Sequence, residues 1–167
     1  MEKVNFLTAG QSEEVALRFA GDLVGKLYLN SLKRDHTDMI NLRCFDANQA
    51  HAIDKLLWQI PENLLIPHKL INDKDSKDCN VEISYPGTRT IKNYDFLINL
   101  NPQLPSNYRD FRETCLIVIK DDSSLQEKAR ASYKKCLKDG IKPTYIDSVS
   151  YTHLRAHETL RYLVCRL

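Results

Sequence analysis

The sequence predicts a three-layer α/β domain with a mostly parallel central sheet and helices on both faces. Short apolar runs typical of buried strands alternate along the chain with longer segments of helical periodicity. Alternation of this kind favours parallel pairing, because each helix carries the chain back across the sheet to start the next strand. About 148 residues precede an unusual final stretch, and this length suits one domain with a proper core.

The first half of the chain is expected to contain two strand–helix pairs followed by an apolar connection. Asp46 stands where it can cap the second helix, and the residue before Pro61 is a poor continuation of that helix. The expected elements are a strand at 4–9, a helix from 11–13 to about 30, a strand at 39–45, a helix over 47–58 and a connection at 62–70.

The second half is expected to hold most of the remaining strands and one long helix. A Pro-Gly turn and charged spacers separate the apolar runs, and Gly140 is a suitable C-terminal cap. The expected elements are strands at 81–85, 96–100 and 115–119, a helix over 124–138 and an edge strand at 144–146.

Composition excludes several classes of protein. Without residues 149–167, basic and acidic residues number 21 each, so the formal net charge falls from +2 to 0, which argues against a polybasic nucleic-acid binder. The N-terminus lacks the long apolar run of a signal peptide, and no stretch approaches a membrane span. The remaining cysteines lack a CxxC pairing and suit a reducing cytoplasm, where we expect the protein to reside; they are Cys44, Cys79, Cys115 and Cys136.

No enzyme site is expected. The first strand-to-helix turn, LTAGQSEE, has a single glycine, whereas dinucleotide and P-loop motifs need several. His68 lies between apolar residues, which indicates a hydrogen-bonded structural histidine, and no residues assemble into a nucleophile, a base and an orienting group. We therefore expect no catalytic residue, metal or cofactor, while a small enzyme that binds a nucleotide at residues 10–12 remains the alternative.

The helix LQEKARASYKKCLKDG carries the most informative pattern. Arg130 and Lys134 are four residues apart and Tyr133 is three after Arg130, so the three side chains project from one side. Together they can hold a carboxylate with a guanidinium fork, an ammonium and an aromatic platform. An ordinary solvated helix face is the alternative. The residues expected to face the sheet are Leu125, Ala129, Cys136 and Leu137.

The final stretch, SVSYTHLRAHETLRYLVCRL, suggests a metal site at first sight, because His153 and His157 are four residues apart. Glu158 follows the second histidine, however, which is the wrong order for HExxH. Residues 149–167 instead match the translation of a transposase-type sequencing-library adapter, both in frame and in spacing. We therefore expect residues 148–167 to be an artefactual read-through and residues 1–147 to form the domain.

Several segments together resemble the chi subunit of bacterial DNA polymerase III holoenzyme. They are IDKLLWQIPENLLIPHKL, VEISYPGTR, FLINL and DSSLQEKARASYKKCLKDG, and they occur in the order and near the spacing of that family. The resemblance covers about residues 3–147. It implies a Rossmann-like domain without nucleotide or catalysis, which agrees with the missing glycines. It also implies an adaptor that joins the psi subunit of the clamp loader to the acidic C-terminal tail of single-stranded-DNA-binding protein.

The resemblance also implies which residues meet each partner. The tail would use Arg130 for its terminal carboxylate, its last apolar ring would lie near Ile119, Tyr133 and Trp58, and its acidic residues would meet the lysines. Two usually basic positions are Gln126 and Leu137 here, which predicts weaker tail binding or a changed salt dependence. The implied tail set is Arg130, Tyr133, Lys134, Ile119 and Trp58, and the implied psi set is Leu65, Ile66, Pro67 and His68.

The sequence thus predicts a non-catalytic replisome adaptor. An apolar, partly exposed connection is a usual mark of a protein interface, which fits the psi set. An alternative function is that of a chi-like partner of a DNA-repair helicase, in which the helicase competes with psi for the same surface.

Overall fold

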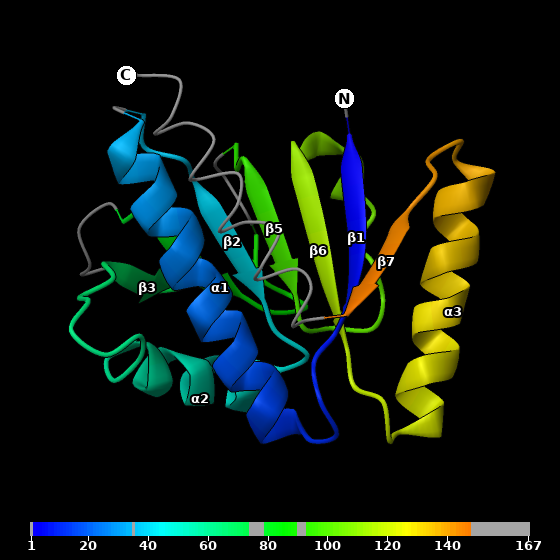
Figure 1. The fold of residues 1–167 in the computed structure, drawn as a ribbon, viewed down its shortest axis with the longest axis horizontal. Helices are drawn as coiled ribbons and strands as arrows, with labels where there is room; N and C mark the ends of the chain where they lie inside the picture. Colours follow the sequence, from blue (N-terminus) through cyan, green and yellow to red (C-terminus); the bar gives the residue numbers. More distant parts are fainter. Residues whose placement is uncertain (1, 35, 74–78, 90–92, 148–167) are drawn as a thin grey trace.

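A central sheet of parallel strands organises the chain, as Figure 1 shows for this computed structural model. The structure describes residues 2–34, 36–73, 79–89 and 93–147. The elements, in chain order, are β1 (Lys3–Thr8), α1 (Glu13–Lys33), β2 (Ile40–Arg43), α2 (Ala47–Leu57), β3 (His68–Leu70), β4 (Val81–Ser84), β5 (Phe96–Asn99), the 3-10 helix η1 (Tyr108–Asp110), β6 (Glu113–Val118), α3 (Ser123–Lys138) and β7 (Thr144–Asp147).

The described residues form a seven-stranded sheet in the order β3-β4-β2-β5-β6-β1-β7. All six strand pairs are parallel, which confirms the predicted mostly parallel sheet. β3 and β7 lie at the two edges, so the predicted edge position of the last strand is confirmed.

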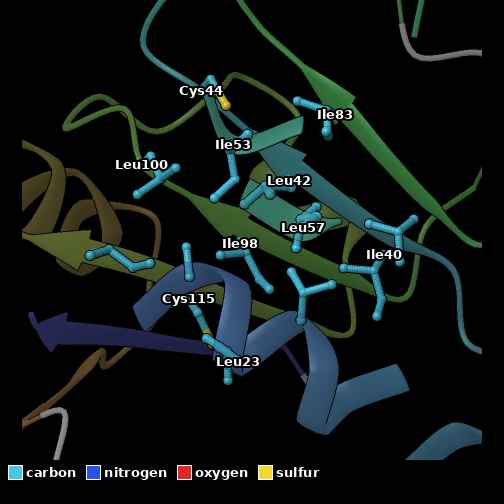
Figure 2. Packing of buried hydrophobic residues seen from close by; sticks show 14 of the residues in the cluster. Leu23, Ile40, Leu42, Cys44, Ile53, Leu57, Ile83, Ile98, Leu100 and Cys115 are labelled. Carbon is cyan, nitrogen blue, oxygen red and sulfur yellow. The ribbon is translucent and has the colours of Figure 1, made fainter. Parts of the chain in front are cut away.

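The helices α1 and α2 cover one face of the sheet. Their apolar side chains pack with those of the strands into one cluster, and Figure 2 shows Leu23 of α1 and Ile53 and Leu57 of α2 among residues of the strands. Every second residue of a strand points to the same face, and Leu7 of β1 and Ile117 of β6 accordingly belong to this cluster.

The other face of the sheet carries α3 and the connection that contains η1. Phe6 of β1 and Leu116 of β6 point to this face and pack with Ala129 and Cys136 of α3 in a second cluster. Helices therefore lie on both faces of a parallel sheet, and the expected three-layer, Rossmann-like α/β class is confirmed.

Local hydrogen bonds explain where the helices begin and end. The side chain of Asp46 accepts a hydrogen bond from the backbone N–H of Gln49 at 2.8 Å, so the predicted cap of α2 is confirmed. Asp122 caps α3 in the same way through the N–H of Leu125. Gly140 follows the end of α3 with φ of +79°, the left-handed conformation that favours glycine at this position.

Two expectations about elements were wrong. The apolar connection predicted at 62–70 ends in a strand, because residues 68–70 add to the edge of the sheet beside β4 as β3. Leu137 was expected to face the sheet, but its side chain is 51% exposed on α3. In the described part of the chain, none of the helices combines the length and the apolar character that crossing a membrane requires.

Candidate functional site: two exposed surfaces

Exposed apolar side chains gather where α2 meets the segment that leads into β3. Trp58 directly follows α2 and is 62% exposed, and Leu65 is 67% exposed. Pro67 is also exposed, and we call these three residues the Trp58–Leu65 patch; the buried His68 directly follows Pro67 in the chain. Large exposed apolar side chains that occur together mark interaction surfaces more often than single ones do.

His68 holds this patch in place. Its ring nitrogens lie 2.7 Å from the carbonyl oxygen of Ile66 and 3.1 Å from that of Asp54 in α2. The ring of Trp58 packs on it with a centroid distance of 4.7 Å. The predicted role of a hydrogen-bonded structural histidine is therefore confirmed, and its contacts join the loop, α2 and the indole ring.

Two glycines of α1 leave room for the loop that runs from Trp58 to Leu65. A Cβ added at Gly21 would approach the Cδ1 atom of Ile60 to 2.7 Å, and one added at Gly25 would overlap the ring of Pro61. Ile66 is completely buried in the core beside this contact. The loop thus lies directly against the backbone of α1. Its buried residues pack on the helix and hold its exposed residues in position.

The second exposed surface lies along α3. Ala129, Ser132 and Cys136 face the sheet, whereas Arg130 and Lys134 are exposed. Tyr133 is half-buried, and its ring meets that of Phe6 edge-on, with centroids 5.3 Å apart and an interplanar angle of 63°. The predicted trio of guanidinium, ammonium and aromatic ring is therefore present on one side of the helix.

The cations of this surface are available to a ligand. Among the residues that the structure describes, Arg130 and Lys134 make no ion pair with an acidic group. Lys135, on the other side of α3, is already engaged, because its ammonium lies 5.3 Å from the ring centroid of Tyr108. Within the part of the chain that the structure describes, the Arg130 side of the helix therefore combines unpaired charge with an aromatic ring.

The turn between β1 and α1 is poorly suited to a phosphate. The side chain of Ser12 accepts a hydrogen bond from the N–H of Val15, so that donor is not directed at a ligand. Glu13 and Glu14 form the first turn of α1, and Asp46 lines the same depression. Two carboxylates at the start of α1 and a third at the start of α2 repel an anion in this depression, which argues against the nucleotide-binding alternative.

Buried cysteines do not resemble activated nucleophiles. Burial raises the pKa of the Cys44 thiol to about 12, and it also raises the pKa of Cys136. A thiol that reacts needs the opposite shift, because the thiolate is the nucleophile. Neither of these cysteines therefore supports an enzymatic role.

One group of potential metal ligands is an ion-pair network. His36, Asp38 and Asp95 lie close together, but Asp38 is buried and meets Arg34 and Arg112 at 2.9 Å each. The two guanidinium groups already neutralise the carboxylate. This cluster therefore joins the end of α1 to the start of β6 and is explained without a metal.

Comparison with known proteins identifies the family. A family model described as "DNA polymerase III chi subunit, HolC" matches residues 1–144. The chain belongs to this family. The protein named DNA polymerase III subunit chi of Haemophilus influenzae is 35% identical over 94 residues, which is 56% of this chain and 65% of that protein. The protein of the same name from Escherichia coli is 32% identical over 93 residues, or 56% of this chain and 63% of that protein. The alignments thus span just under two thirds of the relatives' length.

Within this chi-family chain, the structure divides the residues predicted for the tail. Arg130, Tyr133 and Lys134 lie together on α3. Ile119 directly follows β6 and packs in the cluster on the opposite face of the sheet, beneath α1 and α2. Trp58 contacts His68 and thus belongs to the Trp58–Leu65 patch. Neither Ile119 nor Trp58 is brought to the trio on α3.

The structure also divides the residues predicted for psi. Leu65 and Pro67 are exposed, whereas Ile66 and His68 are buried. Burial alternates along this segment because it is extended and leads into β3, so neighbouring side chains point in opposite directions. A partner on this surface would touch Leu65 and Pro67, while Ile66 and His68 support them from below.

Sequence reasoning missed the exposed Tyr145 on β7, which is 62% exposed at the edge of the sheet near α3. The available signal was the pattern Thr-Tyr-Ile-Asp, in which an aromatic and an aliphatic residue are adjacent. Adjacent residues of a strand face opposite sides of the sheet. Because Ile146 packs in the cluster beneath α1 and α2, Tyr145 faces the other side.

Proposed function

We propose that this chain is a non-catalytic accessory subunit of DNA polymerase III that connects two partners during replication. One partner is the psi subunit of the clamp loader, and the other is the acidic C-terminal tail of single-stranded-DNA-binding protein. Family membership supports the link to the polymerase, and two exposed surfaces of different chemistry support two partners. We expect the protein to act in the cytoplasm, without a cofactor.

The Trp58–Leu65 patch is the proposed psi surface. Its three exposed side chains are apolar, and large residues such as tryptophan supply much of the binding energy of protein interfaces. The buried Ile66 and His68 fix the loop below them, so little conformational freedom is lost on binding. We assign Trp58 to the psi surface and not to the tail surface, because its ring packs on His68.

The Arg130 side of α3 is the proposed tail surface. A terminal carboxylate presents two oxygens, and the planar fork of Arg130 can meet both of them. Lys134 stands one turn further along and can meet a second acidic group. Tyr133, which packs on Phe6, offers the edge of a fixed ring to an apolar side chain of the tail.

The observation that carries this proposal is the position of the two surfaces. The patch belongs to the α1 and α2 side of the sheet, and the trio belongs to α3 on the other side. Ile66, beneath the patch, belongs to the first cluster, and Tyr133 packs on the second. The two partners therefore do not compete for space on the domain.

A binding experiment with both partners tests the proposal. The chain is bound to psi and then titrated with a labelled acidic peptide that ends in phenylalanine, and fluorescence anisotropy is measured. We expect the peptide to bind the chain–psi complex with the affinity that it shows for the chain alone. Displacement of psi by the peptide, or peptide binding that is unchanged in Arg130→Ala, would contradict the assignment of two separate surfaces.

A further inference from the structure

The face of the sheet that carries α3 is only partly covered by an α-helix. α3 packs with β1 and β6 and lies beside the edge strand β7 in Figure 1. β2 and β4 lie on the other side of β5, and the described residues place no α-helix on this part of the face. The turn after β4 and the connection between β5 and β6 border it instead, and they leave a cavity of about 160 Å³.

Strand residues form the floor of this cavity. Asn41 and Arg43 of β2 are two residues apart, so both point to this face, opposite to Leu42. Ser84 is the register partner of Arg43, and the two are the last residues of β4 and β2. Asn41 and Ser84 are buried. The cavity thus has a polar floor toward the carboxyl ends of parallel strands, the end of an open α/β sheet where ligands bind.

The floor has more hydrogen-bond donors than acceptors. The hydroxyl of Ser84 donates to the Oδ1 atom of Asn41 at 2.8 Å, and the buried Nδ2 atom of Asn41 has no hydrogen-bond partner among the described residues. Burial and Glu82 raise the pKa of Tyr94, and the amide of Asn41 opposes this rise without a hydrogen bond of normal geometry. An amide turned by 180° would donate to Ser84 and leave the Ser84 hydroxyl without its acceptor. In either orientation the pair keeps a donor for a ligand.

Arg43 adds a cation that lacks a counter-ion. Its guanidinium is half-buried and donates to the carbonyl oxygen of Gln103 at 3.2 Å. Within the described part of the chain, Arg43 makes no ion pair with an acidic group. Burial lowers the pKa of Arg43 from its ordinary value, because the charged form is partly removed from water. An anion beside it would offset this loss of solvation.

The walls and the size of the cavity limit the ligand. Leu97 and Phe111 line it and are buried, so part of the wall is apolar. The exposed Gly87 also lines it with φ of +95°, and a Cβ added there would meet nothing within 4 Å, so this side is open. A volume of about 160 Å³ holds a molecule about the size of benzene, whereas larger ligands occupy about 300 Å³ or more.

We propose that this cavity binds a small oxyanion, either a carboxylate or a phosphate, through Arg43 and the Asn41–Ser84 pair. The planar guanidinium meets two oxygens of the anion, and the donor that the pair keeps meets one of its oxygens. An apolar group no larger than one ring packs against Leu97 and Phe111. None of the described residues that line the cavity belongs to α3 or to the Trp58–Leu65 patch, so the inference does not depend on the proposed function.

A strand of nucleic acid fits this cavity less well. Such a strand needs a cationic groove with several accessible rings on which bases stack. Arg43 is the one charged residue among the described residues that line the cavity, and the ring of Phe111 is buried. Thymidine monophosphate therefore serves as the competing ligand in the test, because it carries the same phosphate together with a base that has no room.

NMR titration of the full chain tests the site. Sodium phosphate, sodium benzoate and thymidine monophosphate are added separately, with sodium chloride keeping the ionic strength constant. We expect phosphate or benzoate to shift the side-chain amide of Asn41 and the backbone amide of Gly87, with saturation at about millimolar concentration, since ligands of few atoms bind weakly. The tighter of the two identifies the preferred head group. Thymidine monophosphate should bind no more tightly than phosphate.

Two variants and a control assign the contacts. Arg43→Gln should weaken the preferred anion at least about tenfold, and Ser84→Ala about threefold. Arg89→Gln is the matched control, because Arg89 is an exposed arginine that follows the same turn and does not line the cavity. Its affinity should equal that of wild type. Circular dichroism checks that each variant is folded, and Ser84→Ala decides the assignment if Arg43→Gln does not fold.

Three results would overturn the proposal. The first is that neither anion shifts Asn41 or Gly87 beyond the effect of sodium chloride. The second is that Arg89→Gln weakens binding as much as Arg43→Gln or Ser84→Ala does, which would indicate a diffuse attraction by surface charge. The third is that thymidine monophosphate binds about tenfold more tightly than phosphate with the same dependence on Arg43 or Ser84, which would make the ligand a nucleotide.

Discussion

The Trp58–Leu65 patch and the Arg130 side of α3 differ in how they are built. The patch is apolar, and a buried histidine, a buried isoleucine and two glycines of α1 hold it in position. The α3 surface combines unpaired cations with half-buried and exposed apolar side chains on the flank of a capped helix. Binding at the first should depend on apolar burial and little on salt, whereas binding at the second should weaken as salt screens its charges.

The largest expected effect comes from a charge placed in the apolar patch. Leu65→Asp should abolish co-purification with psi, because the buried carboxylate finds no partner in an apolar interface and costs several kcal/mol. Affinity purification of the chain with psi, followed by a folding check from circular dichroism, measures this.

Leu137→Asp provides the matched control for this substitution, since Leu137 is an exposed leucine on the other surface. It should retain psi and lose affinity for the acidic peptide. If Leu65→Asp co-purifies with psi at the wild-type yield, the Trp58–Leu65 patch is not the psi surface.

The next effect concerns the anchor on α3. Arg130→Ala should cost about 2–4 kcal/mol in affinity for the acidic peptide, as expected when one partner of a largely desolvated charge pair is removed. Arg130→Lys should recover only part of this loss, because an ammonium cannot match both oxygens of a carboxylate. Titration with the labelled peptide measures the affinities, and a peptide with an amidated C-terminus tests the carboxylate directly. Amidation without any effect on wild-type binding would remove Arg130 as the anchor.

A smaller effect is expected from a substitution in α1 that disturbs the loop beneath the Trp58–Leu65 patch and leaves α3 unchanged. Gly25→Ala places a Cβ against the ring of Pro61, which cannot rotate away, and should destabilise the fold by about 1–3 kcal/mol despite the better helix propensity of alanine. The shifted loop should weaken psi binding and leave the peptide affinity unchanged. Denaturant unfolding measures the stability, and Lys26→Ala, an exposed neighbour in α1, is the control that should change neither. Equal losses of both partners would show that the two surfaces are not independent.

Removing the second cation should have a modest consequence. Lys134→Ala should cost about 1 kcal/mol or less in peptide affinity, because an exposed ammonium is well solvated and screened. Its main effect should be a shallower dependence of the affinity on salt. Titrations at several salt concentrations measure this slope, and the slope for psi should be unchanged. A loss as large as that of Arg130→Ala would move the anchor to Lys134.

The smallest expected effect is that of the final segment. Deletion of residues 149–167 should leave the melting temperature and both affinities unchanged, because we expect this stretch to be a translated adapter, which would have no reason to complement the domain. The predicted pair of histidines lies outside the described residues. Calorimetric titration of the full chain with zinc should show no binding stronger than that of a peptide with two histidines. A marked fall in melting temperature on deletion would give the segment a structural role.

Periodicity in the sequence predicted most of the fold. The alternation of strand and helix patterns predicted the parallel sheet. The residue types of Asp46 and Gly140 predicted the caps of two helices. β3 was missed because its three residues are too short for a periodic signal, and Pro67 stands directly before it. Its strand character comes from pairing with β4, which is a long-range contact.

The candidate site was predictable where it lies within one helix. Arg130, Tyr133 and Lys134 share a side of α3 because of helical spacing alone. Ile119 and Trp58 were grouped with them without knowledge of the sheet. Their actual faces depend on the register of β6 and on how the loop after α2 closes, and a change of one residue in a strand reverses the face.

The sheet between the two surfaces has a mechanical consequence. A packed core of this kind deforms little, so it would act as a spacer of nearly constant length between the two proposed partners. Each ligand then experiences the other at a raised effective concentration, about millimolar for a short connection. Where the two proposed partners are also connected to each other outside this chain, two individually weak contacts can in this way give a long-lived assembly, while either contact is still able to release and rebind.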